Sequence, residues 1–149
     1  MKGYTKLISF LFIGMLISSC IPAETKVDIN EPTEGSRVSQ IQTIDGESQI
    51  LPPDSVIWPV VYLPATGRYY PQNFPADVQA NGEWSATVFI GQENDSGIAA
   101  DIIVVLADKS AQDAFYSYLA DAKDKNDFSG LDKLPKGATI YDRVSVVRN

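Results

Sequence analysis

The sequence predicts a mainly β fold, an antiparallel sandwich with one helix. From Arg37 onward, short runs rich in β-branched and aromatic residues alternate with turn residues, a spacing typical of sandwiches and barrels. Residues 98–107 are almost wholly apolar, as expected of a central strand covered on both faces. Residues 111–122 repeat apolar side chains at three- and four-residue steps, which indicates a helix.

The first two predicted strands are residues 37–44 and 56–63. Asp45-Gly46 follows the first run directly and is a turn signal. Pro59 lies inside the second run and has no N–H to donate, so we expect an edge strand or a β-bulge there.

The next strands are joined by clear turn signals. Residues 64–67 turn the chain into 68–70, and Asn81-Gly82 favours a tight hairpin. Behind that hairpin, residues 83–90 alternate between two faces of a strand. One face consists of Trp84, Ala86, Val88 and Ile90, and the other of Glu83, Ser85, Thr87 and Phe89.

The helix is inserted before the last strand. Ser110 with Asp113 resembles a capping box, and the helix should end between residues 121 and 125. Residues 138–148 alternate again and form the final strand. We therefore expect a sandwich of about seven strands, with a barrel or an α+β fold on a single sheet as the alternatives. The apolar helix face would consist of Ala111, Ala114, Phe115, Tyr118, Leu119 and Ala122.

The N-terminus is predicted to be an export signal. Two lysines precede an apolar run at residues 7–17, and small residues follow it. Eleven residues at ~1.5 Å each cover about half of a ~30 Å hydrocarbon core, too little for a spanning helix. Residues 17–20 resemble the lipobox of bacterial lipoproteins, which implies a diacylglyceryl group on the thiol of Cys20 and cleavage before it. The alternative is an ordinary secretory peptide with Cys20 as a free thiol.

The lipobox resemblance, the proline-rich acidic composition of residues 21–36 and the strand pattern after Arg37 together divide the chain into three parts. They are a lipoprotein signal peptide at 1–19, a lipidated N-terminus with a flexible tether at 20–36, and the sandwich domain at 37–149. We expect an extracytoplasmic protein whose acyl chains enter the lipid bilayer and hold it on the cell membrane. Ile21 is not the aspartate of an inner-membrane retention signal, so the outer membrane is favoured if the source is Gram-negative.

Composition excludes several function classes. The chain has no histidine and one cysteine, so zinc, copper and haem sites, disulfides and His-dependent catalysis are not expected. Removal of residues 1–19 takes away two lysines and no acid, so the net charge falls from −7 to about −9. An acidic chain without a basic block is a poor partner for nucleic acid. We expect no cofactor and no metal.

The candidate ligand-binding surface is a group of aromatic residues with one arginine. Flat rings on a sheet surface can stack on sugar rings, and an arginine beside them can add a polar contact. The same rings are also the ordinary filling of a sandwich core, and this alternative stays open. The candidate residues are Trp58, Arg68, Tyr69, Tyr70 and Trp84.

Two further candidate sites have plain solvated loops as their alternative interpretation. Residues 91–97 offer oxygen ligands, but an EF-hand register would place Gln92 and Ile103 where carboxylates are required, so only an irregular calcium site is conceivable. A glycoside hydrolase needs two carboxylates that flank the scissile bond. The candidates for such a pair are Glu83, Glu93, Asp95 and Asp101.

Residues 54–148 resemble an uncharacterised immunoglobulin-like domain of bacterial extracytoplasmic proteins. The motifs that carry the resemblance are Trp58-Pro-Val-Val-Tyr62, Arg68-Tyr-Tyr-Pro-Gln72, Gly82-Glu-Trp-Ser85, Ile90-Gly91, Val105-Leu-Ala-Asp108 and Leu134-Pro-Lys-Gly137. The resemblance implies an immunoglobulin-like sandwich and no particular activity. We expect a non-catalytic module that binds an envelope protein or polysaccharide. The alternatives are a passive structural lipoprotein and a carboxylate-dependent glycoside hydrolase.

Overall fold

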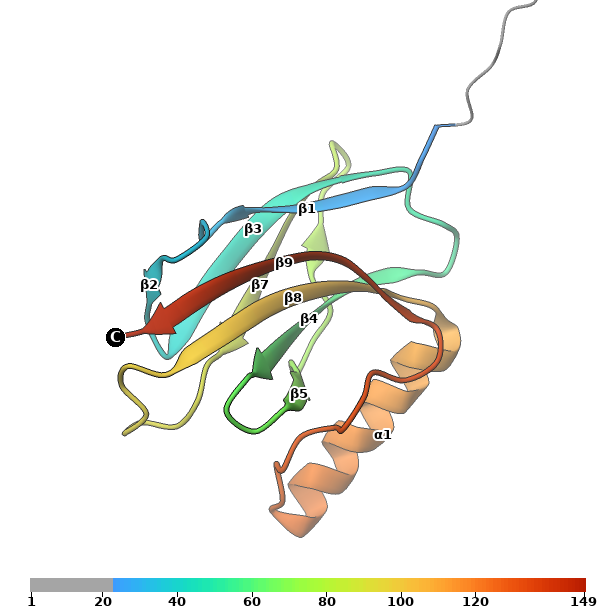
Figure 1. Cartoon of the computed structure of the whole chain (residues 1–149). Helices are drawn as coiled ribbons and strands as arrows, with labels where there is room; N and C mark the ends of the chain where they lie inside the picture. Colours follow the sequence, from blue (N-terminus) through green and yellow to red (C-terminus); the bar gives the residue numbers. More distant parts are fainter. Residues whose placement is uncertain (1–22) are drawn as a thin grey trace, which may run out of the picture.

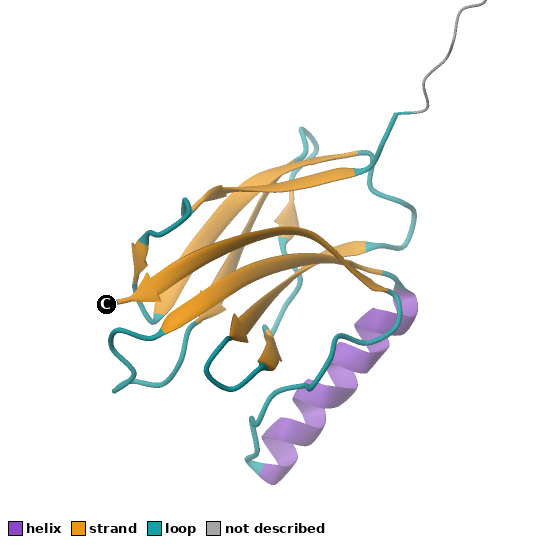
Figure 2. Cartoon of the chain, in the orientation of Figure 1, coloured by secondary structure: helices purple, strands orange, loops and turns teal. Residues whose placement is uncertain are grey.

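The computed structural model describes residues 23–149, and in this range the chain forms nine strands and one helix (Figures 1 and 2). The predicted segments at 1–19 and Cys20 lie outside the described residues. The elements are β1 (Lys26–Glu31), β2 (Arg37–Val38), β3 (Ile41–Gln49), β4 (Val56–Leu63), β5 (Arg68–Pro71), β6 (Asp77–Val78), β7 (Glu83–Phe89), β8 (Ala99–Ala107), α1 (Lys109–Lys125) and β9 (Ala138–Arg148).

The strands form two sheets, which confirms a mainly β fold with one helix before the last strand. One sheet has the order β1-β3-β7-β6 and the other the order β2-β9-β8-β4-β5. Neighbouring strands run antiparallel, except that β2 pairs with β9 in parallel. Two sheets exclude the single-sheet alternative.

The predicted tether is wrong from residue 26 onward, because Lys26–Glu31 forms β1 and pairs with β3. Val27 is buried in the core, and the N–H of Ile29 donates to Asp142 Oδ2 at 2.8 Å. This strand lies at a sheet edge and buries little apolar surface, so its sequence has the polar character of a tether. The folded domain therefore begins about ten residues earlier than predicted.

The predicted turn at Asp45-Gly46 is also wrong, since both residues lie inside β3. A Cβ atom on Gly46 would overlap the carbonyl oxygen of Asp28 and the ring of Trp84. Glycine is required here because the carbonyl of Asp28 and the ring of Trp84 approach the strand closely, and not because the chain turns.

Pro59 does not mark an edge, because β4 lies between β5 and β8. Its carbonyl accepts the backbone N–H of Gln72 at 3.0 Å, just beyond the end of β5. The nitrogen and carbonyl of one residue in an antiparallel strand face the same side. The missing N–H therefore leaves the ladder to β8 intact.

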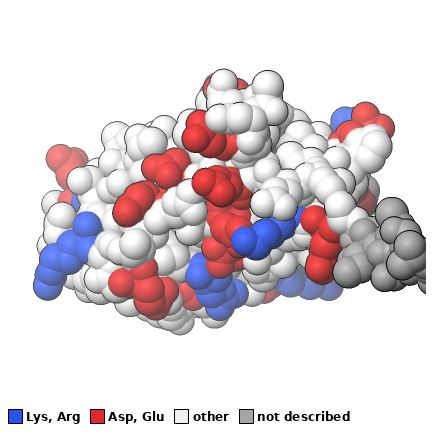
Figure 3. All heavy atoms as spheres, turned by 90° about the horizontal axis from the view of Figure 1, so that it is seen from above, with Lys and Arg blue, Asp and Glu red and all other residues white. Residues whose placement is uncertain are grey.

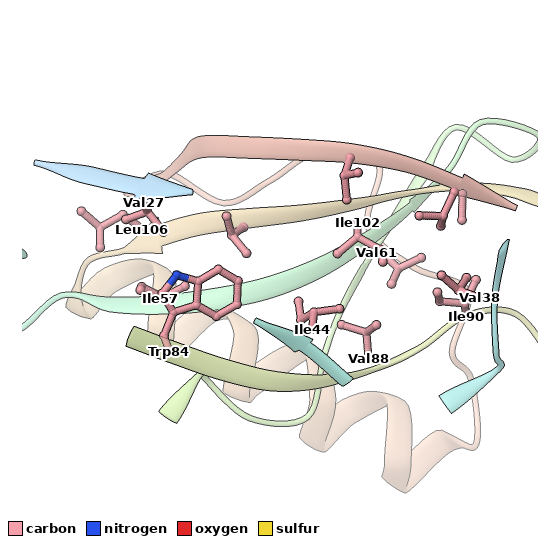
Figure 4. Packing of buried hydrophobic residues seen from close by; sticks show 14 residues of the cluster. Val27, Val38, Ile44, Ile57, Val61, Trp84, Val88, Ile90, Ile102 and Leu106 are labelled. Atoms are coloured by element: carbon pink, nitrogen blue, oxygen red, sulfur yellow. The ribbon is translucent and has the colours of Figure 1, made fainter. Parts of the chain in front are cut away.

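The apolar residues form two layers. Between the sheets lie Trp84, Ile44, Ile57 and Ile102 with their neighbours, shown in Figure 4. The second layer lies between the five-stranded sheet and α1 and consists of Trp58, Val60, Ile103, Val105, Ala107, Ala111 and Phe115. The apolar run of β8 supplies residues to both layers, which confirms that it is covered on both faces.

The helix begins at a different cap from the predicted one. Asp108, rather than Ser110, is the N-cap, and its Oδ1 accepts the backbone N–H of Ala111 at 2.9 Å. The C-terminal end falls where expected, with Asn126 in the left-handed conformation as the C-cap. The apolar helix period is confirmed by Ala111, Phe115 and Ala122, which are all buried.

Candidate functional site

An open cavity of about 560 Å³ lies where the β4–β5 hairpin, the end of β7 and the end of α1 meet. We call it the aromatic hollow, because four rings line it: Tyr70, Phe89, Tyr118 and Phe128. Aliphatic side chains and a few polar groups complete the lining. Ligand sites of proteins have this size and this mixture of apolar walls and sparse polar groups.

The hairpin wall is held by a turn hydrogen bond and by a close approach to Gly130. The N–H of Gly67 donates to the carbonyl of Leu63 at 2.9 Å and closes the turn between the two strands. The ring of Tyr70 is fixed from the other side by Gly130, where a Cβ atom would lie 2.9 Å from Tyr70 Cε1. Gly130 also has φ +80°, a conformation that favours glycine.

Gln72 connects the two sheets at the base of the hollow and is only 5% exposed. Its Oε1 accepts the backbone N–H of Phe89 at 2.7 Å, and its Nε2 donates to the carbonyl of Tyr70 at 2.9 Å. The backbone carbonyl of Gln72 accepts a hydrogen bond from Nε1 of Trp58 at 2.9 Å. Sequence reasoning missed this residue, since no local pattern shows that one amide bridges two sheets.

The loop of residues 91–97 forms the opposite wall and is held from below by Arg148. The buried guanidinium donates to the carbonyls of Gln92 and Glu93, the latter at 2.9 Å. Oδ2 of Asp95 accepts the backbone N–H of Gln92 at 2.7 Å. That carboxylate therefore stabilises the loop itself. Within residues 23–149, no group of three or more acidic, cysteine or histidine side chains is placed to hold a metal ion.

The helix wall carries Tyr118, whose hydroxyl oxygen accepts the backbone N–H of Gly130 at 3.1 Å. Burial raises the pKa of this phenol above its ordinary value of about 10, and the hydrogen bond from Gly130 opposes the rise only in part. Tyr118 thus keeps its proton at neutral pH. The O–H group can donate to an acceptor in the hollow.

The predicted binding surface is wrong for its two tryptophans, because both are buried. Trp58 is fully enclosed and packs on Phe115, with ring centroids 5.1 Å apart. Trp84 is 2% exposed and lies between the sheets (Figure 4). The core interpretation therefore holds for these rings, since large aromatics fill the space between packed layers.

Of the remaining three predicted residues, only Tyr70 lines the hollow. Tyr69 lies on the outer face, where it packs on Tyr62 with centroids 4.8 Å apart and exchanges backbone hydrogen bonds with Leu131. Arg68 pairs with Asp132 at 3.0 Å. Phe89 and Phe128, which sequence reasoning did not select, contribute the most exposed rings of the site.

The four candidate carboxylates lie in three separate places. Glu83 lies on the outer face of the four-stranded sheet, opposite Glu47 of β3. Asp101 lies on β8, where its carboxylate accepts a hydrogen bond from Ser145 Oγ at 2.8 Å and forms a salt bridge with Arg143 at 3.3 Å. Glu93 and Asp95 lie in the 91–97 loop. A smaller hollow of about 290 Å³ beside Glu83 is also lined by Asp45 and Glu47.

None of the helices that the structure describes has the length and apolar character needed to cross a bilayer. Comparison of the chain with models of known protein families finds no match. Comparison with curated proteins finds no match either.

Proposed function

We propose that the chain is a lipid-anchored, non-catalytic binding module of the cell envelope, with the aromatic hollow as its ligand site. The observation that supports this proposal is the exposure of two rings in a cavity whose walls are held by hydrogen bonds: Phe89 is 46% and Phe128 54% exposed. Exposed aromatic side chains held on fixed strands and loops are favourable recognition surfaces.

The strand order supports an immunoglobulin-like sandwich. In that fold, one sheet has the strands A, B, E and D, and the other contains C, F and G. The order β1-β3-β7-β6 matches the first sheet, and β9-β8-β4 matches the second. The helix α1 takes the place of the loop between F and G, at the position where related sandwiches carry variable loops.

The proposed anchor lies close to the domain. If Cys20 is acylated, only residues 20–25 separate the lipid from β1. At ~3.3 Å per residue this link extends to about 20 Å at most. Lys26 pairs with Gln49 at one end of β3, whereas Phe89 pairs with Ile41 at the other end, about 26 Å away. The hollow therefore lies at the end of the sandwich remote from the lipid.

The binding proposal is tested with envelope material from which the lipids have been extracted, so that the acyl chains have no bilayer to enter. Purified full-length protein in detergent should co-sediment saturably with this material. Phe89→Ala and Phe128→Ala should weaken the binding about ten-fold, because each removes a ring of the hollow. Tyr141→Ala is the control, since Tyr141 is an exposed aromatic outside the hollow. Equal binding by all variants would refute the site.

The anchor is tested separately by mass spectrometry of the mature N-terminus. We expect Cys20 as the first residue, with a diacylglyceryl group on its sulfur. Incorporation of a labelled fatty acid should occur in the wild-type protein and be lost in Cys20→Ala. An unmodified thiol at the mature N-terminus would contradict the lipid anchor and leave the hollow unaffected.

A further inference from the structure

The charges of the aromatic hollow restrict its ligand. Among the described residues, Asp95 is the only charged side chain in its lining. Neither Arg148 nor Arg68 lines the hollow, since Arg148 donates to the carbonyls of Gln92 and Glu93 and Arg68 pairs with Asp132. An anion that entered would lose its hydration without gaining a cation. Figure 3 shows acidic side chains interspersed with lysine and arginine on the face seen from above, and the net charge of −7 disfavours anions for the molecule as a whole.

The walls favour a ligand with flat apolar faces. Tyr70, Phe89 and Phe128 present ring surfaces, and Leu63 and Leu119 fill the space between the segments. The C–H groups on one face of a sugar ring form such a surface. Burial of this surface against aromatic rings is favourable, although each sugar keeps its hydroxyl groups at the rim.

The polar groups of the hollow match those hydroxyl groups. No hydrogen bond within residues 23–149 engages the side-chain amide of Asn73, which offers both donors and an acceptor. Asp95 keeps Oδ1 as an acceptor, and Tyr118 keeps its O–H as a donor. An apolar peptide side chain would bury these groups without partners, at a cost in affinity.

We infer that the aromatic hollow binds an uncharged glycan, with Phe89 and Phe128 stacked on sugar rings and with Asn73 and Asp95 bonded to hydroxyl groups. This inference rests on the proposed binding function and names its ligand class. It requires no covalent step, and it assigns no catalytic residue.

The experiment uses full-length protein in detergent micelles on an array of neutral oligosaccharides and uronic-acid oligosaccharides. Calorimetry then follows with the strongest neutral binder. We expect saturable binding to at least one neutral glycan and none to the acidic ones. Phe89→Ala should weaken binding about ten-fold, and Asp95→Asn several-fold, because an amide accepts hydrogen bonds less strongly than a carboxylate. Tyr141→Ala should leave the affinity unchanged.

The failures of the two proposals are distinguishable. Binding to acidic glycans alone, or to no glycan on the array, would overturn the glycan inference. If Phe89-dependent binding to delipidated envelopes persisted in that case, the binding module would stand with a different ligand class. If that binding were absent as well, the proposed function would fall too.

Discussion

Two apolar surfaces of this domain lie side by side and differ in what covers them. Under α1, the middle of the outer face of the five-stranded sheet is buried, with Trp58 and Ile103 fully enclosed by Phe115 and its neighbours. In the aromatic hollow, Phe89 and Phe128 remain about half exposed. The chain thus supplies its own cover for one surface and leaves the other open. The open surface is therefore the better candidate for an external ligand.

Phe115→Ala should have the largest effect, because it removes the ring that encloses Trp58. We expect the free energy of unfolding to fall by about 3–5 kcal/mol through lost burial and a cavity under the helix. Denaturant unfolding of the purified protein measures this. Ser117→Ala on the same helix is the control, since it leaves the buried layer intact. A loss below ~1 kcal/mol in Phe115→Ala would show that α1 is not a tight cover.

A change at the N-cap of α1 should have a smaller effect on stability. Asp108→Ala removes the acceptor for the N–H of Ala111 and should cost about 1 kcal/mol of unfolding free energy. Ser110→Ala is the matched control, because Ser110 lies inside the first helical turn and should change stability little. A larger loss in Ser110→Ala than in Asp108→Ala, measured by denaturant unfolding, would place the cap at Ser110 and contradict the assignment of Asp108.

The covered region could be predicted from sequence far better than the open one. The helix period from Ala111 to Ala122 and the apolar run of β8 are local patterns that follow from burial, and both are confirmed. Gly46 was misread, because a glycine that admits a tryptophan ring has the same sequence signal as a glycine in a turn. Both tryptophans were candidates for binding or for the core, and only their packing decides between these.

The hollow is harder to predict because its parts come from three segments that are far apart in the sequence. Tyr70, Phe89, Tyr118 and Phe128 acquire a common cavity only through the pairing of strands and the docking of the helix. Gln72 bridges the sheets through backbone groups, which leave no trace in the residue pattern. Tyr70 is a candidate from the sequence only because aromatic residues gather near it, at positions 58–74.

Phe89→Ala separates the two surfaces most directly. Because the ring is already 46% exposed, its loss should lower the free energy of unfolding by less than about 1 kcal/mol. Binding to delipidated envelopes should nevertheless weaken about ten-fold. Phe115→Ala has the opposite profile under conditions where it stays folded, with a large stability loss and a small change in binding. A Phe89→Ala variant with a large stability loss would mean that this ring belongs to the closed core.

Tyr118 lies on α1 and lines the hollow, and its titration gives the smallest effect. Its pKa is raised by burial, so the folded state holds the phenol proton more tightly than the unfolded state does. The corresponding stability is fully present below the unfolded pKa of about 10 and is lost as the pH rises through the folded pKa. The Tyr118→Phe variant has no phenol, so its stability lacks this pH dependence. It also lacks the acceptor for the N–H of Gly130 and should be less stable at neutral pH by about 1 kcal/mol.

The stability difference between wild type and Tyr118→Phe should therefore narrow above pH 10, because only the wild-type protein loses the contribution of the buried phenol. Lys26 and Lys109 also have raised pKa values, from hydrogen bonds to Asp28 and Asp113, but both variants share them and their effect cancels in the difference. Urea unfolding from pH 7 to pH 11 measures this difference. Parallel stability curves above pH 10 would mean that the hydroxyl is as well solvated as in the unfolded chain, and the hollow would then be too open at this wall to hold a ligand away from water.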